Sequence, residues 1–184
     1  MGSSITLVNN FNIEKVLFNI GEYNDLEQKL INILNVKKIK YYQNINKLDI
    51  NNKTLYFLNN RLYDNENDNS NIIYLKIDNY KFLFMGDASI NVENNILNNY
   101  NLDNIDFLKI GHHGSKTSSS NYFINKINPK YSIISVGKNN RYGHPNKEVI
   151  DILNNKVVYR TDINGSIKIL LKNDKFKIKL INKK

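Results

Sequence analysis

Leu108-Lys109-Ile110-Gly111-His112-His113-Gly114-Ser115 joins an apolar run to a polar loop that carries two adjacent histidines. The apolar residues at its start are typical of a buried strand, which we expect over residues 107–110. A glycine on each side of the histidines lets the backbone approach a bound ion or phosphate closely. Because loops beyond strand ends are where a rigid scaffold presents functional groups, this stretch predicts a candidate site at a strand end.

Strands and helices alternate on both sides of this stretch. The expected strands are 14–19, 54–58, 72–77, 81–85, 107–110, 131–136, 157–160, 167–171 and 176–181. The expected helices are about 25–34, 92–100, 120–127 and 147–153. Asp78-Asn79 predicts a tight hairpin, since both residue types tolerate positive φ. The pattern predicts a mixed α/β protein in which helices and sheets form layers, with residues 1–184 as a single domain.

The composition limits the classes of function. The chain has 184 residues, of which 41% are hydrophobic, enough for one domain with a sizeable core. The absence of Cys excludes a disulfide scaffold, a Cys-ligated zinc site and a thiol nucleophile. No apolar run approaches the ~18–20 residues that span a bilayer. The chain is therefore predicted to be soluble, in the cytoplasm or held at a membrane through a larger parent protein.

The charge is strongly positive, at +9, which suits a polyanionic partner such as nucleic acid. The lysines are scattered along the chain rather than gathered in one stripe. Asn occurs 36 times, and Asn, Lys and Ile are all encoded by codons rich in A and T. Genome bias explains much of this composition, so basicity alone is weak evidence for a nucleic-acid partner.

Three loops hold the residues that suggest metal or phosphate chemistry. Asp87 follows Gly86, and its carboxylate is a ligand that zinc or manganese takes together with imidazole. The alternative is that Asp87 caps the following helix, and the spacing leaves both open. For His112 and His113, metal or phosphate contact is favoured over an exposed turn, because residues 115–120 supply hydroxyls, a cation and a helix N-terminus. His144 alone is compatible with a simple turn residue.

Taken in order, six motifs closely resemble the C-terminal metallo-β-lactamase-fold domain of the ComEC family of competence proteins and its stand-alone relatives. They are residues 66–70, 84–87, 108–115, 134–137, 142–145, and 159–162 with Gly165. The resemblance covers roughly residues 67–169. It implies a metallo-β-lactamase-like αββα four-layer sandwich, with a metal site at the edge of the sandwich.

The resemblance also implies roles for particular residues. Asp87 matches the carboxylate that bridges two divalent metal ions, zinc or manganese, and His112 or His113 matches a late histidine ligand. His144 would face the substrate or its phosphate, so Asp87 and His144 are the expected catalytic residues. The polar groups expected around the substrate are Asn69, Ser115, Lys116, Arg141 and Asp162. Two such ions lower the pKa of a bound water, orient it and stabilise charge on the leaving oxygen.

The activity that the resemblance implies is hydrolysis of DNA phosphodiesters during DNA uptake. The expected partners are single-stranded or linear DNA and the membrane-channel part of a larger ComEC-like protein. One alternative is a nucleic-acid-binding module without catalysis, and another is a hydrolase of a lactone or thioester on the same fold. The Ser- and Lys-rich loop after His113 and the Arg141-Tyr142 loop favour a phosphorylated substrate.

One family motif, His-x-(His/Asp)-x-Asp-His, does not occur in the sequence. Residues 1–4 lie where this motif should just have ended. The chain is therefore expected to be N-terminally truncated, either as a fragment or with residues 1–4 as a remnant joined at that boundary. Either case removes opening strands of the first sheet and most of one metal's ligands. We expect weak metal binding, impaired activity and association through the exposed sheet edge.

Overall fold

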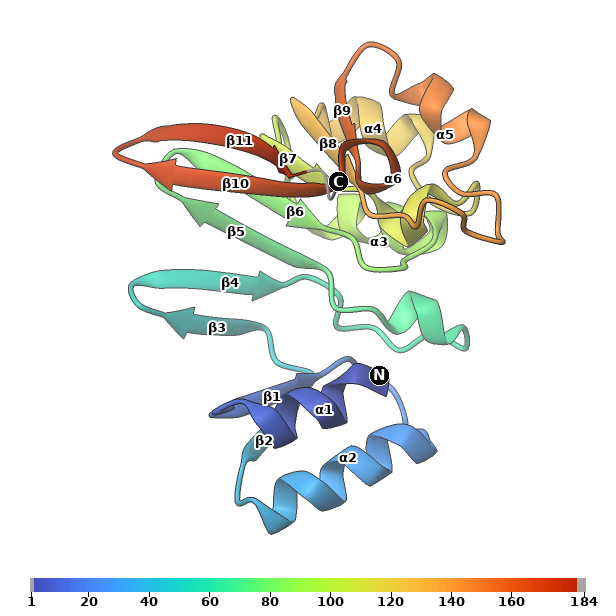
Figure 1. The fold of residues 1–184 in the computed structure, drawn as a ribbon. Helices are drawn as coiled ribbons and strands as arrows, with labels where there is room; N and C mark the ends of the chain where they lie inside the picture. Colours follow the sequence, from blue (N-terminus) through green and yellow to red (C-terminus); the bar gives the residue numbers. More distant parts are fainter. Residues whose placement is uncertain (1, 182–184) are drawn as a thin grey trace.

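A seven-stranded mixed sheet forms the centre of the computed structural model, which describes residues 2–181 (Figure 1). Its strand order is β3-β4-β5-β6-β7-β8-β9. The strands are β3 (Lys47–Ile50), β4 (Lys53–Phe57), β5 (Ile73–Ile77), β6 (Tyr80–Phe84), β7 (Phe107–Lys109), β8 (Tyr131–Ile134) and β9 (Val157–Arg160). Neighbours from β3 to β6 pair antiparallel, and neighbours from β6 to β9 pair parallel.

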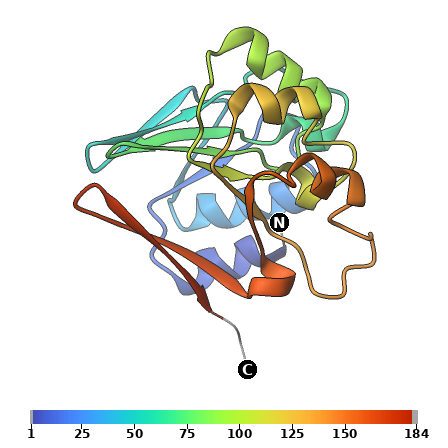
Figure 2. The same ribbon diagram turned by 90° about the horizontal axis from the view of Figure 1, so that it is seen from above.

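Three helices connect the parallel strands and cover one face of the sheet: α3 (Ile90–Asn99), α4 (Asn121–Ile127) and α5 (Lys147–Ile152) (Figure 2). The main hydrophobic core lies between them and the sheet, where Leu83 and Leu108 of the strands pack with Ile96 and Ile124 of the helices. Since β6, β7, β8 and β9 run in the same direction, their carboxyl ends meet at one edge. The fold thereby brings the loops that follow these four strands together.

The other face of the sheet carries a hairpin of β10 (Ser166–Lys172) and β11 (Lys175–Ile181). Phe176 of β11 packs edge-on against aromatic rings of the sheet. Its ring centroid lies 5.2 Å from those of Tyr80 and Phe107 and 5.3 Å from that of Tyr131. Aromatic side chains therefore hold the hairpin against the sheet face opposite α3, α4 and α5.

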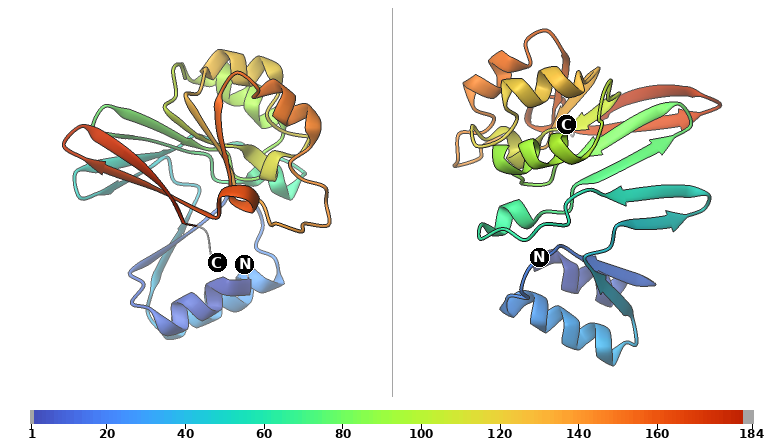
Figure 3. Two further views of the ribbon diagram at one scale, coloured as in Figure 1. Left: turned by 45° about the horizontal axis from the view of Figure 1, so that its top comes forward. Right: turned by 180° about the vertical axis from the view of Figure 1, so that it is seen from behind.

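The N-terminal part forms a block with its own hydrophobic cluster (Figure 3). Its elements are α1 (Gly2–Asn10), β1 (Lys15–Phe18), α2 (Asp25–Val36) and β2 (Lys40–Gln43), and β1 pairs parallel with β2. Leu34 and Leu30 of α2 are buried against Phe18 of β1 and Val8 of α1. At the start of α2, Asn24 and Glu27 form a reciprocal capping box, which satisfies N–H groups that the helix leaves free.

The structure confirms the predicted mixed α/β class. In Figure 2 the seven-stranded sheet lies between α3 and α4 on one side and α1, α2 and the β10–β11 hairpin on the other. The second sheet layer consists of two separate pairs, β1–β2 and β10–β11, among the described residues. This order of helix, sheet, sheet and helix corresponds to the predicted four-layer arrangement. That residues 1–184 are a single domain stays a prediction.

Most expected elements occur within a few residues of the predicted bounds, and Asp78 turns the β5–β6 hairpin with φ 54°. The sequence pattern did not predict α1, β2 and β3, nor α6 (Thr161–Asn164), which lies where a loop was expected after β9. The strands β2 and β3 were not predicted because most of their residues are charged or exposed. Between residues 2 and 181, no helix has both the length and the apolar character needed to cross a membrane.

Candidate functional site

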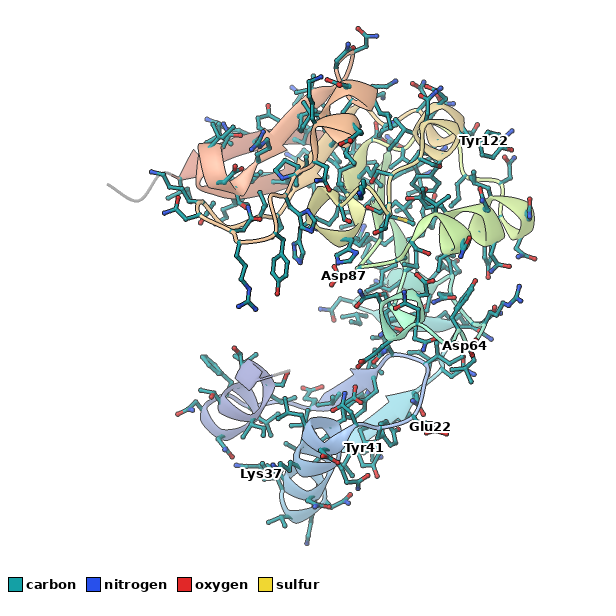
Figure 4. The ribbon with its side chains drawn as sticks, turned by 90° about the vertical axis from the view of Figure 1, so that its right-hand side faces the viewer. Glu22, Lys37, Tyr41, Asp64, Asp87 and Tyr122 are labelled. Atoms are coloured by element: carbon teal, nitrogen blue, oxygen red, sulfur yellow. The ribbon has the colours of Figure 1, made fainter. Side chains whose placement is uncertain are left out.

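Asp87 lies in the turn between β6 and α3, at the edge where the parallel strands end. Gly86 precedes it with φ 56°, and a Cβ at Gly86 would lie only 2.6 Å from Ser70 Cβ. This close approach lets the Asp87 backbone N–H donate to Ser70 Oγ at 3.1 Å. The Asp87 carboxylate stays partly exposed, and Figure 4 places it on the side that faces the N-terminal helices. Ser89, not Asp87, caps α3, so the capping alternative is wrong.

His112 and His113 both adopt positive φ, 42° and 55°, in a short turn over Gly111–Gly114. The turn is tied to the preceding loop, because the His112 N–H donates to Gly86 O at 2.9 Å. A carbonyl oxygen only accepts hydrogen bonds, so the 2.6 Å contact with Ser135 O places the proton of His113 on Nδ1. In the neutral ring, Nε2 then carries a free lone pair, and it lies 3.7 Å from Asp87 Oδ1.

This geometry distinguishes the two adjacent histidines. A metal-ligating histidine usually donates its other ring N–H to a carbonyl or carboxylate, which fixes the tautomer. His113 has this arrangement, because its Nδ1 meets Ser135 O and its Nε2 faces Asp87. His112 instead lies with Nδ1 3.4 Å from Thr117 Oγ1. The structure therefore brings His113, rather than His112, next to Asp87.

His144 joins the same group from the loop after β8. Its ring centroid lies 5.9 Å from that of His112, and the His112 ring lies 6.4 Å from the His113 ring. His144 Nδ1 is buried and has no hydrogen-bond partner among the residues that the structure describes. All three histidines of the chain thus converge with Asp87 at one edge of the sheet.

Asn140 and Asn146 organise the loop that carries His144. The Asn140 side chain donates to His144 O at 2.6 Å and accepts from the His144 N–H at 2.9 Å, which closes the loop across its base. Asn146 Oδ1 accepts the Lys116 backbone N–H at 2.8 Å. These bonds join the loop after β8 to the loop after His113, and they leave Lys116 and Arg141 exposed beside the histidines.

A buried carboxylate on α3 holds the loop after His113. Glu93 is fully buried and accepts the backbone N–H groups of Ser119 and Ser120. Burial raises the pKa of Glu93, and these hydrogen bonds oppose that effect. Ser118 Oγ then donates to Gly111 O at 2.9 Å, which ties the loop to the histidine turn. Sequence reasoning missed Glu93; its signal was a charged residue next to Val92 on the apolar face of a helix.

A second buried carboxylate, Asp68, holds the turn that carries Asp87. Asp68 accepts the Ser89 N–H at 2.8 Å and the Ser89 hydroxyl at 2.9 Å. The backbone around Asp68 is fixed in turn by Asn59 Nδ2, which donates to Asp68 O at 2.7 Å. Asp68 lies within the first of the six motifs, but no pattern in the sequence indicates that its side chain reaches Ser89.

Lys109 places a cation near Asp87. It is the last residue of β7, and its Nζ donates to Ile110 O at 2.9 Å. Burial lowers the pKa of Lys109, and the neighbouring Asp87 carboxylate opposes this by raising it. Among the described residues the ammonium group has no salt-bridge partner within 4.0 Å. Lys109 is therefore held by the Ile110 carbonyl, and the Asp87 carboxylate favours its charged form.

Three of the polar residues expected around a substrate are engaged within their own loops. The Asn69 amide accepts the Tyr63 N–H at 2.8 Å and donates to Tyr63 O at 2.9 Å. Asp162 is paired with Arg160 through contacts of 3.1 and 2.6 Å, and this pairing lowers the pKa of Asp162. Ser115 is buried with its Oγ 3.0 Å from Thr117 Oγ1. Contacts of these three residues with a phosphate stay predictions.

The described residues supply only part of a metal centre. A catalytic zinc site takes three protein ligands and keeps a fourth position open. Between residues 2 and 181, no three His, Asp or Glu side chains come together closely enough to hold an ion. Asp87 and His113 form a pair of suitable donors, and a pair does not make a complete centre. The donor set of this part of the chain does not fit a closed two-metal site.

Comparison with known proteins identifies relatives of part of the chain. No protein-family model matches. ComE operon protein 3 of Bacillus subtilis (strain 168) is 38% identical over 110 residues, which are 59% of this chain and 14% of that protein. Recombination protein 2 of Haemophilus influenzae is 33% identical over 115 residues, 60% of this chain and 14% of that protein. The chain thus spans about one seventh of the length of these two relatives.

A third relative, the competence protein ComA of Neisseria gonorrhoeae, is 41% identical over 66 residues, or 33% of this chain and 9% of that protein. A solved structure from Thermotoga maritima, described as a Zn-dependent hydrolase of the metallo-β-lactamase superfamily, is 12% identical with a TM-score of 0.41. It covers 80% of this chain and 81% of that one. The sequence matches confirm the resemblance read from the six motifs: the matched part of the chain is similar to parts of ComE operon protein 3, Recombination protein 2 and the competence protein ComA.

Proposed function

We propose that the chain is part of a metal-dependent hydrolase that acts on DNA phosphodiesters during DNA uptake. On this proposal the residues of the described part bind DNA at the edge where β6, β7 and β8 end. Cleavage at full rate requires metal ligands in addition to Asp87 and His113. The membrane-channel partner expected from the resemblance belongs to the same proposal, and the matched relatives are long enough to contain further parts.

The observation that carries this proposal is the convergence of Asp87 with three histidines beside exposed cations. Imidazole and carboxylate are the donors that zinc and manganese accept together, which supports a metal of that class. His113 Nε2 and the Asp87 carboxylate are the groups that would hold it. Lys116 and Arg141 lie where they can contact phosphate, and a net charge of +9 favours a polyanion over a neutral lactone.

A second candidate function is DNA binding without catalysis. The specific observation in its favour is that the described residues bring together only two metal donors, Asp87 and His113. In that case the histidine-rich edge would hold phosphates and position a strand. The two functions differ in one property: cleavage depends on a metal ion, whereas binding by lysine and arginine depends on salt concentration.

Metal-dependent cleavage of linear DNA tests both candidates. The chain is incubated with labelled DNA and manganese or zinc, with and without a chelator, beside the variant Asp87→Ala. We expect DNA binding that weakens as salt rises, with slow cleavage that the chelator and Asp87→Ala both abolish. Binding with no cleavage under any metal supports the binding module. Cleavage that survives Asp87→Ala contradicts the proposed site, and a chain that binds no DNA at low salt contradicts both functions.

A further inference from the structure

The loop after β8 ends in an exposed tip, Arg141-Tyr142-Gly143. The Asn140 side chain bonds to both the N–H and the C=O of His144, so the tip is held in one conformation by its base. Gly143 has φ 68°, and apart from its two chain neighbours no described residue has an atom within 4 Å of the position that a Cβ there would take. The tip therefore projects away from the rest of the fold on a fixed support.

Tyr142 at this tip is 66% exposed. The ring stacks loosely on His144, with centroids 5.9 Å apart and an interplanar angle of 18°. The Arg141 guanidinium lies 5.1 Å from the ring centroid and donates to the Tyr142 hydroxyl at 2.9 Å. An aromatic ring this exposed adds little to a hydrophobic core, and here it is presented beside the three histidines.

We propose that Tyr142, with Arg141, is a stacking platform for an unpaired base of single-stranded DNA. This inference rests on the proposed function, because it names single-stranded DNA as the form of DNA that the proposed site binds. Nucleic-acid bases in single strands stack on exposed aromatic rings, and arginine adds a cation–π contribution. Bases within a duplex are already stacked on their neighbours and cannot use the platform.

The platform lies next to the histidines and cations of the proposed site. His144 is in contact with the Tyr142 ring on one side and 5.9 Å from the His112 ring on the other. The backbone N–H of Lys116 donates to Oδ1 of Asn146, which lies at the end of the same loop. A nucleotide whose base stacks on Tyr142 therefore has its phosphate within the region of the histidines and exposed cations. The platform selects single strands, and the charged groups hold their backbone.

The absence of Trp from the chain allows a direct test. The variant Tyr142→Trp carries a single indole, whose fluorescence is quenched when a base stacks on it. The probes are a single-stranded oligothymidylate, an abasic oligomer of the same length and a duplex. We expect oligothymidylate to quench the indole strongly, while the abasic oligomer and the duplex leave its fluorescence unchanged although they bind through phosphates.

Tyr122 provides the matched control, because it is 64% exposed but lies on α4 (Figure 4). Tyr122→Trp is expected to show no quenching with any of the three probes. In the chain without Trp, Tyr142→Ala is expected to weaken binding of oligothymidylate about tenfold, with Tyr142→Phe close to the original protein. Circular dichroism confirms that each variant is folded.

The outcomes separate this inference from the proposed function. If the chain binds DNA, but Tyr142→Ala binds oligothymidylate as tightly as the original and the indole is not quenched, the platform is excluded and DNA binding stands. Equal quenching at positions 142 and 122 also overturns the inference, because it indicates non-specific contact. If the original chain binds none of the probes, the proposed function fails and the platform fails with it.

Discussion

At the scale of single residues, the site depends on which nitrogen of His113 carries the proton. The carbonyl oxygen of Ser135 accepts a hydrogen bond from Nδ1–H of His113, which directs Nε2 of the same ring toward Asp87. Neighbouring His112 has no carbonyl partner of this kind within residues 2–181, and its Nδ1 faces the Thr117 hydroxyl. Two adjacent histidines with the same flanking residues therefore differ in what they can bind. This difference comes from tertiary contacts and could not be predicted from the sequence.

The asymmetry predicts different effects of the same substitution at the two positions. In His113→Asn, the amide nitrogen can still donate to Ser135 O, but the Nε2 lone pair is lost. We expect zinc affinity, measured by titration calorimetry, to fall at least tenfold in this variant, since ligand geometry governs affinity. His112→Asn is the control and is expected to keep most of the affinity. A larger loss in His112→Asn than in His113→Asn would show that the wrong histidine was assigned.

At the scale of secondary-structure elements, α3 couples the two loops that form the site. It begins three residues after Asp87, and Glu93 in its first turn accepts the backbone N–H groups of Ser119 and Ser120. The carboxylate accepts two N–H groups that burial removes from water, and an unpaired buried N–H costs about 1–3 kcal/mol. Glu93 is therefore a positioning residue: it acts through the loop after His113 and not on a ligand.

Glu93→Gln tests this coupling. Gln keeps one oxygen acceptor but turns an NH₂ group toward the second N–H donor, so we expect a loss of about 1–3 kcal/mol in the free energy of unfolding by urea. The pKa of Glu93 is raised in the folded protein, so the folded state binds this proton more tightly than the unfolded state does. The original chain should therefore lose stability as the pH rises through the folded pKa. Glu93→Gln should lack this slope, and equal pH profiles would contradict the assignment.

The elements that sequence reasoning predicted and missed differ in what stabilises them. The strand 107–110 and the helices about 92–100 and 120–127 were predicted because each has an apolar face that packs in the main core. The strands β2 and β3 have half-exposed, lysine-containing sequences, so their pairing partners stabilise them rather than a local pattern. Glu93 and Asp68 were missed for a related reason, since each carboxylate bonds to residues distant in sequence. The grouping of Asp87 with the histidines was predicted from the family resemblance, and the structure explains it, because the parallel strands end at one edge of the sheet.

At the scale of the whole molecule, the part of the chain that the structure describes has two hydrophobic cores rather than one. Helices α3, α4 and α5 pack on the seven-stranded sheet, whereas α1, α2, β1 and β2 enclose a separate cluster. The chain runs from one region to the other through the segment that leads to β3 (Figure 3), and the Asn24 side chain also donates to Glu66 across the two regions at 3.3 Å. Independent cores are free to open separately, so a loss of packing in the smaller core need not disturb the larger one.

Leu34→Ala tests whether the two cores unfold independently. Leu34 is fully buried in the N-terminal cluster, so its truncation is expected to cost about 2–5 kcal/mol within that block. Hydrogen exchange, read by mass spectrometry of peptides, should then speed up in α1, α2, β1 and β2 while β7 and β8 keep their protection.

The matched control is Leu108→Ala in β7, which is equally buried in the main core. If Leu34→Ala accelerates exchange to the same extent in both regions, the chain unfolds as one cooperative unit. In that case, damage in the N-terminal block should also weaken DNA binding at the histidine edge; with independent cores, binding should persist.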